Sequence, residues 1–307
     1  MEELYLTYAK QMRDKYGEKV YKLPVNLPAT CPNRDGTKGT GGCIFCGAKG
    51  TGFENLSNTI SVSEQLEINK NYIGPKYKAN LFVAYFQNFT NTYFSPERMY
   101  DYTRQAAEVD GVVELCFATR PDCVGTDVLD AIKAGAMGKQ VCIEFGLQSV
   151  NEETLVRINR GHTVKEYIEA VERVKSYGFT VGTHMILNLP WDSREDCIAG
   201  AKLLSELDID TAKTHTLYIE KGTELCRMYE AGEIEICSKE EYIHRAVDFL
   251  EHLKPDISVQ RLASRVPNGD TIFCNWGSGW WKLRDMIEDE MRKRGSVQGI
   301  KWRSNNG

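Results

Sequence analysis

Three cysteines are the residues of this chain whose type and spacing most clearly suggest chemistry. Cys31 is followed after eleven residues by Cys43, and after two more by Cys46, within a glycine-rich stretch. Three thiolates on one loop can bind three irons of a [4Fe–4S] cluster and leave the fourth iron open to another ligand. The open iron would be the place where a reaction begins.

Two other interpretations of this loop remain open at the level of spacing. A structural zinc site usually has four ligands, often in two C-x-x-C pairs, and here the next cysteine is Cys116 and the first histidine is His162. The thiols could also be unligated. A phosphate-binding loop is disfavoured, because no Gly-Lys-Ser/Thr follows the glycines. The spacing therefore favours an iron–sulfur cluster over zinc and over free thiols.

The elements that position this loop follow a repeated strand-then-helix pattern. Apolar segments predict strands over residues 20–27, 81–86, 112–117, 141–147, 180–187 and 211–217. Helices are predicted after Ser95 and over residues 126–134, 164–177 and 193–207. This alternation implies parallel pairing with right-handed crossovers. Six units are too few for a closed eight-fold barrel, so the predicted fold is α/β, an open partial (β/α)6 barrel.

Polar residues follow the second to sixth of these strands, at the edge where parallel α/β folds place their sites. They are Gln87 and Asn88, Thr119 and Arg120, Gln148 and Ser149, Asn188, and Tyr218 and Glu220. Any one of them is an ordinary loop residue. Because they recur around the cysteine loop, which itself follows the first strand, they predict one site at this end of the sheet.

Composition indicates a globular protein without a membrane segment. The chain has 307 residues, of which 42% are hydrophobic and 26% are charged. Neither a leader sequence nor an apolar run long enough to span a bilayer is present. The other cysteines are scattered as reduced thiols are, so we expect a cytoplasmic protein. The net charge of −5 disfavours a strongly basic nucleic-acid binder.

Several motifs together resemble the radical S-adenosylmethionine (SAM) superfamily. They are the cysteine loop, the turn at residues 118–122, the stretch 144–149 running on to 158–162, and Gln-Asn-Phe-Thr-Asn-Thr-Tyr at 87–93. More narrowly, the chain is similar to the YtqA/YhcC type, which shares the long first cysteine spacing. Most of the superfamily has three residues there. A weaker similarity extends to the elongator radical SAM core and to oxygen-independent coproporphyrinogen oxidase.

This resemblance implies a cluster held by the three cysteines and SAM bound at its open iron. Reductive cleavage of SAM would give a 5′-deoxyadenosyl radical that takes a hydrogen atom from the substrate, while the protein positions the substrate. The resemblance places Phe45 near the adenine, Gln148 at the ribose, Arg160 at the SAM carboxylate and Gln87 near its amine. Thr119, Glu144 and Asn188 complete the cofactor-binding residues that we expect.

Glu144 points to the same side of its strand as Gln148. A solitary buried carboxylate is costly, so a partner is required, which would be the ribose, a barrel lysine or another ion-pair partner. His184 and His215 also lie on predicted strands. Each is equally a hydrogen-bonded core residue or a residue facing the substrate.

The chain after residue 222 no longer follows the barrel pattern. We expect a barrel domain over 1–222, with the cluster loop at 31–46, and a C-terminal extension over 223–307. The extension should contain a helix at 239–253 and an edge strand at 257–262. Aromatic and basic residues alternate from Trp280 to Arg303, as in surfaces that bind unpaired bases, although a capping helix with solvated charges is the alternative.

The resemblance implies a tRNA-modifying enzyme, which would convert 5-carboxymethylaminomethyluridine at the wobble position to 5-aminomethyluridine. A small-molecule or peptide radical reaction is the enzymatic alternative, and an iron–sulfur electron carrier is the non-enzymatic one. A carrier would need no open iron. The substrate contacts that we expect are Tyr218, Arg261, Trp281 and Lys282, with Cys123 and Cys274 as possible radical-relay thiols. Flavodoxin or ferredoxin is the expected reductant.

Overall fold

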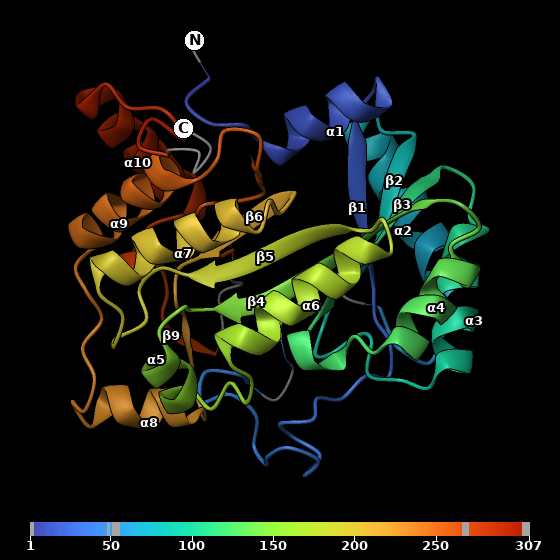
Figure 1. Ribbon diagram of the computed structural model, residues 1–307, viewed down its shortest axis with the longest axis horizontal. Coiled ribbons are helices and arrows are strands. Elements are labelled where there is room, and N and C mark those ends of the chain that lie inside the picture. The colour runs from blue at the N-terminus through green and yellow to red at the C-terminus, as the bar shows by residue number, and fades with distance from the viewer. Residues whose placement is uncertain (1–2, 48–49, 51–55, 266–269, 303–307) are drawn as a thin grey trace.

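One curled sheet of parallel strands forms the centre of the molecule (Figure 1). The computed structural model describes residues 3–47, 50, 56–265 and 270–302, in which the strand order is β1-β2-β3-β4-β5-β6-β8, with every pair parallel. The strands are β1 (Val20–Val25), β2 (Leu81–Phe86), β3 (Val112–Thr119), β4 (Gln140–Gln148), β5 (Thr180–Ile186), β6 (Thr211–His215) and β8 (Ser258–Val259). The predicted partial barrel is confirmed, and β8 is the expected extra strand at its edge.

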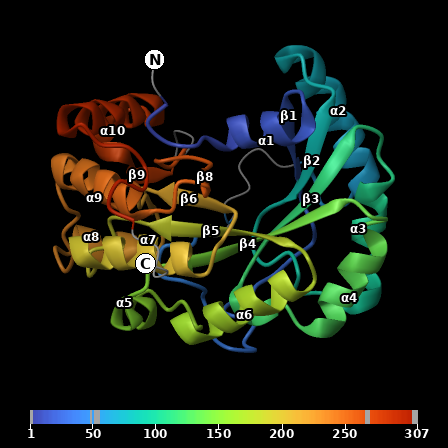
Figure 2. The same ribbon diagram turned by 45° about the horizontal axis from the view of Figure 1, so that its top comes forward.

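Helices cover the outer face of this sheet (Figures 1 and 2). They are α2 (Val62–Tyr77), α3 (Pro96–Ala107), α4 (Thr126–Gly135), α6 (Val164–Ser176) and α7 (Arg194–Glu206). Capping boxes begin α6 at Thr163 and α7 at Ser193, as the sequence pattern indicates. Helix α2 was not predicted from the sequence, and Gly74 and Pro75, which usually end a helix, lie inside its last turn.

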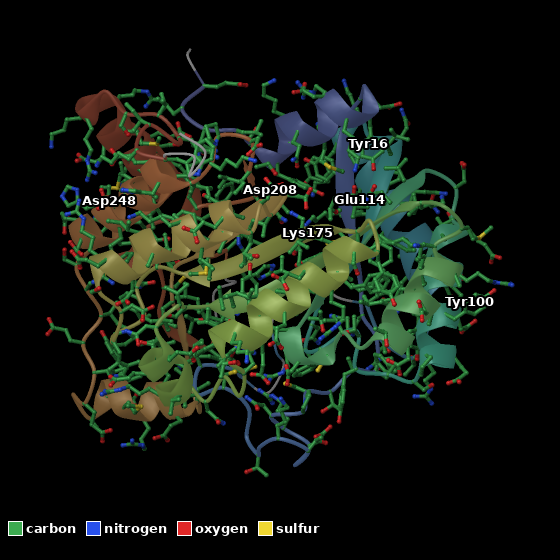
Figure 3. The ribbon with its side chains drawn as sticks, in the orientation of Figure 1. Tyr16, Tyr100, Glu114, Lys175, Asp208 and Asp248 are labelled. Atoms are coloured by element: carbon green, nitrogen blue, oxygen red, sulfur yellow. The ribbon has the colours of Figure 1, made fainter. Side chains whose placement is uncertain are left out.

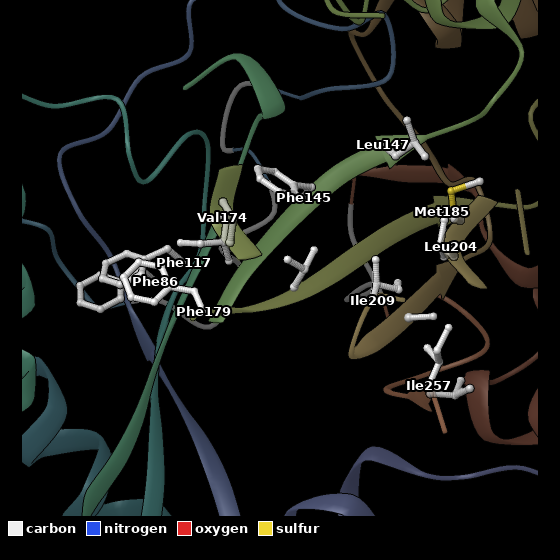
Figure 4. Packing of buried hydrophobic residues seen from close by; sticks show 14 of the residues in the cluster. Phe86, Phe117, Phe145, Leu147, Val174, Phe179, Met185, Leu204, Ile209 and Ile257 are labelled. Atoms are coloured by element: carbon white, nitrogen blue, oxygen red, sulfur yellow. The ribbon is translucent and has the colours of Figure 1, made fainter. Parts of the chain in front are cut away.

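Strand β4 shows how the two faces of the sheet divide. Val141, Ile143, Phe145 and Leu147 belong to the large hydrophobic core. Figure 4 shows Phe145 and Leu147 in that core with the aromatic pair Phe86 and Phe117, whose ring centroids are 4.3 Å apart. The alternate residues Glu144, Gly146 and Gln148 line an internal cavity. The two-residue period of a strand therefore separates the packing face from the functional face.

Helix α1 (Tyr8–Tyr16) closes the end of the barrel opposite the cysteine loop. It connects the two edges of the sheet, since it contacts β1 and β8, and the Val259 amide donates to the Leu6 carbonyl at 2.8 Å. Met12 on its inner face is buried against the interior side chains of β2, β3 and β4. Figure 3 shows Tyr16 near Glu114, to which its hydroxyl donates at 3.1 Å.

The remaining elements extend one side of the barrel. They are α5 (Glu152–Arg157), α8 (Glu224–Glu230), α9 (Lys239–His252), α10 (Trp280–Arg294), a small antiparallel pair β7 (Ile219–Glu220) and β9 (Thr271–Phe273), and the 3-10 turn Asn275–Gly277. A second 3-10 turn, Pro121–Cys123, follows β3 and contacts α6 and β4 instead. Helix α9 packs on α7, and α10 packs on α9. Arg294 of α10 pairs with Asp248 of α9 at 2.8 Å, and Figure 3 places Asp248 on this side of the molecule. The division at residue 222 stays a prediction.

Candidate functional site

A cavity at the carboxyl ends of the strands brings most of the predicted site residues together. Its lining includes Cys31, Cys43, Phe45, Cys46, Gln87, Thr119, Glu144, Gln148, Arg160, Tyr218 and Arg261. Residues from the cysteine loop and from the ends of β2 to β6 therefore meet in one space. His184 and His215 line it too, so both belong to the site and not only to the core.

The cysteine loop is fastened to the loop that follows α5. The Asn159 side chain donates to the Gly42 carbonyl at 2.8 Å, and the Asn33 side chain donates in return to the Asn159 carbonyl at 2.5 Å. Gly161 lies against Asn33 so closely that a Cβ there would be 2.4 Å from the amide oxygen. The motif at residues 158–162 thus fixes the position of Cys43. Sequence reasoning missed Asn33, which looks like any polar loop residue.

Arg160 lies between the cysteine loop and β4. Its guanidinium donates through Nε and Nη2 to the Gly146 carbonyl at 2.9 and 2.6 Å, and Nη1 is 3.7 Å from Sγ of Cys43. Gly146 allows this approach, because a Cβ there would be 2.8 Å from Nη2. Arg160 therefore places a positive charge beside the thiol. A contact with the SAM carboxylate stays a prediction.

The three loop thiols are not arranged to bind a single metal ion together. A tetrahedral zinc holds its sulfur ligands about 4 Å apart. Among the described residues, the one set of three Cys, His, Asp or Glu with all ligand atoms within 4.8 Å of one another is Cys116, Cys142 and Glu144. At least one pair of the loop thiols is therefore more than 4.8 Å apart, which is too far for a single ion to bind all three thiols as they stand. Burial raises the pKa of Cys46, against the opposing charge of Arg34.

Three residues that line the cavity have strained backbone. Asn88, Phe89 and Gln148 have φ values of 86°, 54° and 77°, in the left-handed region that side chains other than glycine rarely adopt. All three line the cavity. Such strain persists where the surroundings enforce it, most often at functional sites. A bulge in the β4–β5 pairing between Gly146 and Gln148 accompanies the turn that directs Gln148 inward.

Glu144 is the centre of a buried charge network. Its carboxylate accepts from Lys22 Nζ at 2.6 Å, from Gln260 Nε2 at 2.6 Å and from His184 Nε2 at 2.9 Å, and Lys213 Nζ lies 3.5 Å away. Burial would raise the pKa of Glu144, but Lys22 and Lys213 lower it well below its usual range. Of the partners expected for Glu144, the structure therefore shows lysines of the barrel, Lys22 and Lys213. A contact between Glu144 and the cofactor stays a prediction.

Lys213 is the weakly paired cation of this network. It donates to the Tyr85 hydroxyl at 2.8 Å and shares with Lys22 the single carboxylate of Glu144. Burial, only partly opposed by Glu144, lowers the pKa of Lys213 to about 7. Sequence reasoning named neither lysine, although a lysine inside an apolar strand is a signal of a buried partner.

Two histidines connect Glu144 to Arg261. Arg261 Nη2 lies 2.7 Å from Nδ1 of His215, whose Nε2 is 3.3 Å from Nδ1 of His184. Because a guanidinium only donates, Nδ1 of His215 must accept, so the Nε2 proton of His215 points to His184, and that of His184 to Glu144. Both imidazoles are then neutral. In agreement, burial lowers the pKa of His184 to about 4 and lowers that of His215 as well.

Of the residues predicted to contact the cofactor or the substrate, three do not line the cavity, and neither do Ser149 and Glu220 at the strand ends. Asn188 is buried, and its side-chain oxygen accepts from the Leu217 amide at 2.7 Å, so it supports the loop after β6. Trp281 and Lys282 lie exposed on α10. Cys123 and Cys274 are half-buried outside the lining, and burial raises their pKa values to about 12 and about 11. Arg303, the end of the predicted contact segment, lies outside the described residues.

The basic residues near the end of α10 are paired with acids of the same region. Arg292 is 2.8 Å from Asp289, Lys293 is 3.3 Å from Glu290, and Arg294 joins Asp248 on α9. This part of α10 therefore matches the alternative of a capping helix rather than a surface that binds phosphates. Toward its start, the Trp280 ring lies 5.9 Å from the guanidinium carbons of Arg284 and of Arg265, and Arg265 lines the cavity. The start of α10 is therefore next to the cavity.

The curled parallel sheet and the three-cysteine loop at its carboxyl edge define an enzyme of the radical SAM class. The sequence profile of the radical SAM superfamily matches residues 30–204, and that of the Radical_SAM C-terminal domain matches residues 209–293. The chain belongs to the radical SAM superfamily. Its members use a [4Fe–4S] cluster and SAM. The three spaced thiols, with Arg160 beside them, fit these cofactors.

Relatives align over most of the chain. YtqA of Bacillus subtilis is 35% identical over 298 residues, 97% of this chain and 92% of the relative. The resemblance to the YtqA/YhcC type is confirmed. A tRNA uridine(34) acetyltransferase of Methanocaldococcus infernus is 29% identical over 188 residues, 60% of this chain and 34% of the relative.

A solved structure, Elp3 of Methanocaldococcus infernus, shares the fold. The TM-score is 0.69 at 18% identity, and the match covers 91% of this chain and 64% of that chain. Within the part of the chain that is described, no helix combines the length and apolarity needed to cross a membrane.

Proposed function

We propose that this enzyme modifies the wobble uridine of transfer RNA, converting 5-carboxymethylaminomethyluridine to 5-aminomethyluridine. The observation that carries the proposal is the single cavity that joins the three-cysteine loop to an inner group of cationic and imidazole side chains. A substrate held there would lie next to the place where SAM is cleaved. Relatives named as tRNA uridine(34) acetyltransferases support transfer RNA as the substrate class.

In this proposal Cys31, Cys43 and Cys46 hold the cluster, and Phe45, Gln148 and Arg160 contact SAM. When bound, the two cofactors supply a radical able to remove a hydrogen atom. The chain's own residues would orient the substrate. The end of the barrel that α1 closes, opposite the cysteine loop, would keep bulk water away.

The reaction begins at the methylene between amine and carboxylate, where both groups stabilise a radical. Loss of one hydrogen atom there, followed by loss of one electron to a one-electron acceptor and of the amine proton, gives an imine. Water then hydrolyses the imine to the aminomethyl nucleoside and glyoxylate. Carbon, nitrogen and charge balance in this sequence.

Substrate entry would take place beside the start of α10. Arg265 and Trp280 lead from the cavity to the surface, and Trp281 and Lys282 follow them in the exposed part of the helix. Aromatic rings next to cations are suited to stacking on unpaired bases. These side chains, with Tyr218 and Arg261 inside the cavity, are the proposed substrate contacts.

A small-molecule or peptide substrate is the second candidate. The observation in its favour is the ion pairing of Arg292, Lys293 and Arg294, which leaves little free positive charge on α10 for phosphates.

The deciding experiment compares nucleosides in transfer RNA from cells with and without the gene. Accumulation of the carboxymethylaminomethyl form in the deletion, reversed by the parent gene and not by a Cys43→Ala gene, is the expected result. Identical nucleoside profiles would reject transfer RNA as the substrate and favour the second candidate. Incubation of the anaerobically reconstituted enzyme with the purified transfer RNA and SAM should then release glyoxylate.

A further inference from the structure

The charges that line the cavity are strongly unequal. Six lining residues have basic side chains, and among the described lining residues Glu144 is the one carboxylate: Arg34, Arg120, Arg160, Lys213, Arg261 and Arg265 against Glu144. A buried cation is costly unless an anion or a set of acceptors lies beside it. Each of these cations therefore needs an anion or a set of acceptors, supplied either by the chain or by a bound molecule.

The cations near the cysteine loop already have such partners. Arg160 lies beside Cys43 and donates to the Gly146 carbonyl, and Arg34 donates to the carbonyls of Cys46 and Gly47 at 2.7 Å. Arg120 pairs with Asp122 at 2.9 Å. Thiolates at this end would add further negative charge. The remaining excess of positive charge lies at the end of the cavity away from the cysteine loop. We call this end the inner cavity and define it by His184, Lys213, His215 and Arg261.

Arg261 is the cation whose charge is least compensated. Within the described part of the chain no carboxylate lies within 4.0 Å of its guanidinium, and its Nε is buried without a hydrogen-bond partner. Its one short contact is with a neutral imidazole, that of His215. Buried N–H groups are nearly always bonded to an acceptor, so an acceptor from a bound molecule is expected here.

The surroundings hold Arg261 ready for such a molecule. The chain of hydrogen bonds from Glu144 through His184 and His215 ends on its Nη2 and sets the orientation of the guanidinium. Its backbone is fixed as well, because the Arg261 carbonyl accepts from the amide of Thr214 at 3.1 Å. Lys213 precedes Thr214 on β6, so a second cation faces the cavity from the adjacent strand.

We propose that Arg261 and Lys213 form a subsite in the inner cavity that binds the carboxylate of the substrate. A planar carboxylate matches the fork of N–H donors of a guanidinium, and an ammonium group from the side adds a point charge. This inference rests on the proposed function and deepens it, since the carboxymethylamino group has a carboxylate that the product lacks. Binding at the subsite places the neighbouring methylene toward the cysteine loop, and loss of the carboxylate favours product release.

The test uses the reconstituted holoenzyme with Arg261→Gln and Arg261→Lys. Arg261→Gln should raise the KM for carboxymethylaminomethyl-containing transfer RNA by about tenfold or more, as expected when one charge-assisted hydrogen bond is lost. Arg261→Lys, which keeps the charge but not the fork, should lie between parent and Gln variant. Iron content and SAM affinity should not change. Arg227→Gln, which alters an exposed arginine paired with Glu224 and Glu233, is the matched control.

Two results would overturn the subsite. One is an unchanged KM in Arg261→Gln. The other is a loss of SAM affinity with the substrate KM unchanged, which would assign Arg261 to the carboxylate of SAM instead.

If the parent enzyme does not act on transfer RNA at all, the proposed function fails and the subsite is tested separately. The probe is N-methylglycine, compared with N-methylethanolamine, which lacks the carboxylate. Saturation-transfer NMR should show contact of the parent protein with N-methylglycine only, and loss of that contact in Arg261→Gln. No contact with N-methylglycine in the parent would overturn the subsite.

Discussion

Glu144 shows how one buried side chain can set the protonation of a whole group of residues. It is ionised because two lysines face it, and its negative charge holds the Nε2 proton of His184. That proton in turn fixes the tautomer of His215 and the orientation of Arg261. Replacement of Glu144 by glutamine would therefore remove an ion pair. It would also alter the tautomer of His215 and the orientation of Arg261, which Glu144 reaches through His184.

The neutral state of His184 predicts a pH-dependent stability. Its pKa is about 4 in the folded protein and 6.5 in the unfolded chain, so below pH 6.5 the unfolded chain binds the proton first. The free energy of unfolding should fall as the pH decreases from 6.5 to 4, by at most about 1.4 kcal/mol per pH unit from this group. In His184→Gln, which keeps a donor toward Glu144, urea unfolding should show a shallower dependence. Equal slopes in parent and variant would contradict the assignment.

The cysteine loop predicts a simple outcome for iron binding. A variant with Cys31, Cys43 and Cys46 all changed to alanine should show no cluster absorbance after anaerobic reconstitution, because no other described trio of cysteines lies on one loop. Cys237→Ala, at a half-buried thiol away from the cavity, should reconstitute like the parent. Four irons per chain in the triple variant would show that the ligands lie elsewhere.

At the scale of the elements, local sequence signals determine how much could be predicted. The strands and the helices with clear caps, such as α6 and α7, were predicted because pattern and capping residues coincide. The pairing of Arg261 with His215, or of Asn33 with Asn159, was not predictable, since each joins residues far apart in sequence through side-chain geometry. The exposed position of Trp281 likewise depends on which face of α10 packs on α9.

The contact between Gly161 and the cysteine loop predicts a mutational effect. Gly161→Ala introduces strain at φ +70° and also a clash with Asn33, whereas Gly178→Ala introduces the strain alone, at φ +76° with open space around it. Gly178→Ala should lower the free energy of unfolding by about 1 kcal/mol. Gly161→Ala should cost about 1–3 kcal/mol more and weaken cluster retention. Urea denaturation measures the loss of stability, and iron content measures cluster retention. Equal effects of the two changes would show that the cysteine loop can move to accommodate the added methyl group at no cost.

At the scale of the whole molecule, the start of α10 is the part expected to meet a large substrate. Trp281→Ala should weaken transfer RNA binding by about 1–3 kcal/mol if the ring stacks on a base. Tyr72→Ala, at an exposed aromatic residue on the outer helix α2, is the control and should bind as the parent does. Because Arg292, Lys293 and Arg294 are already paired, their replacement should change the salt dependence little. Filter binding over a range of salt concentrations measures both effects.

The contacts of the chain's first residues have a consequence for the order of folding. The Leu6 amide donates to the Gln298 side chain at 2.9 Å, the Gln298 amide donates to the Leu4 carbonyl at 2.9 Å, and the segment before α1 also pairs with Val259. During synthesis residues 4–7 are therefore made long before Val259 and Gln298, the partners with which they close the barrel. The cysteine loop is likewise synthesised before β2 to β6, whose carboxyl ends surround it, so an emerging chain presents its thiols to cluster-assembly factors, and to oxygen, until those strands have assembled.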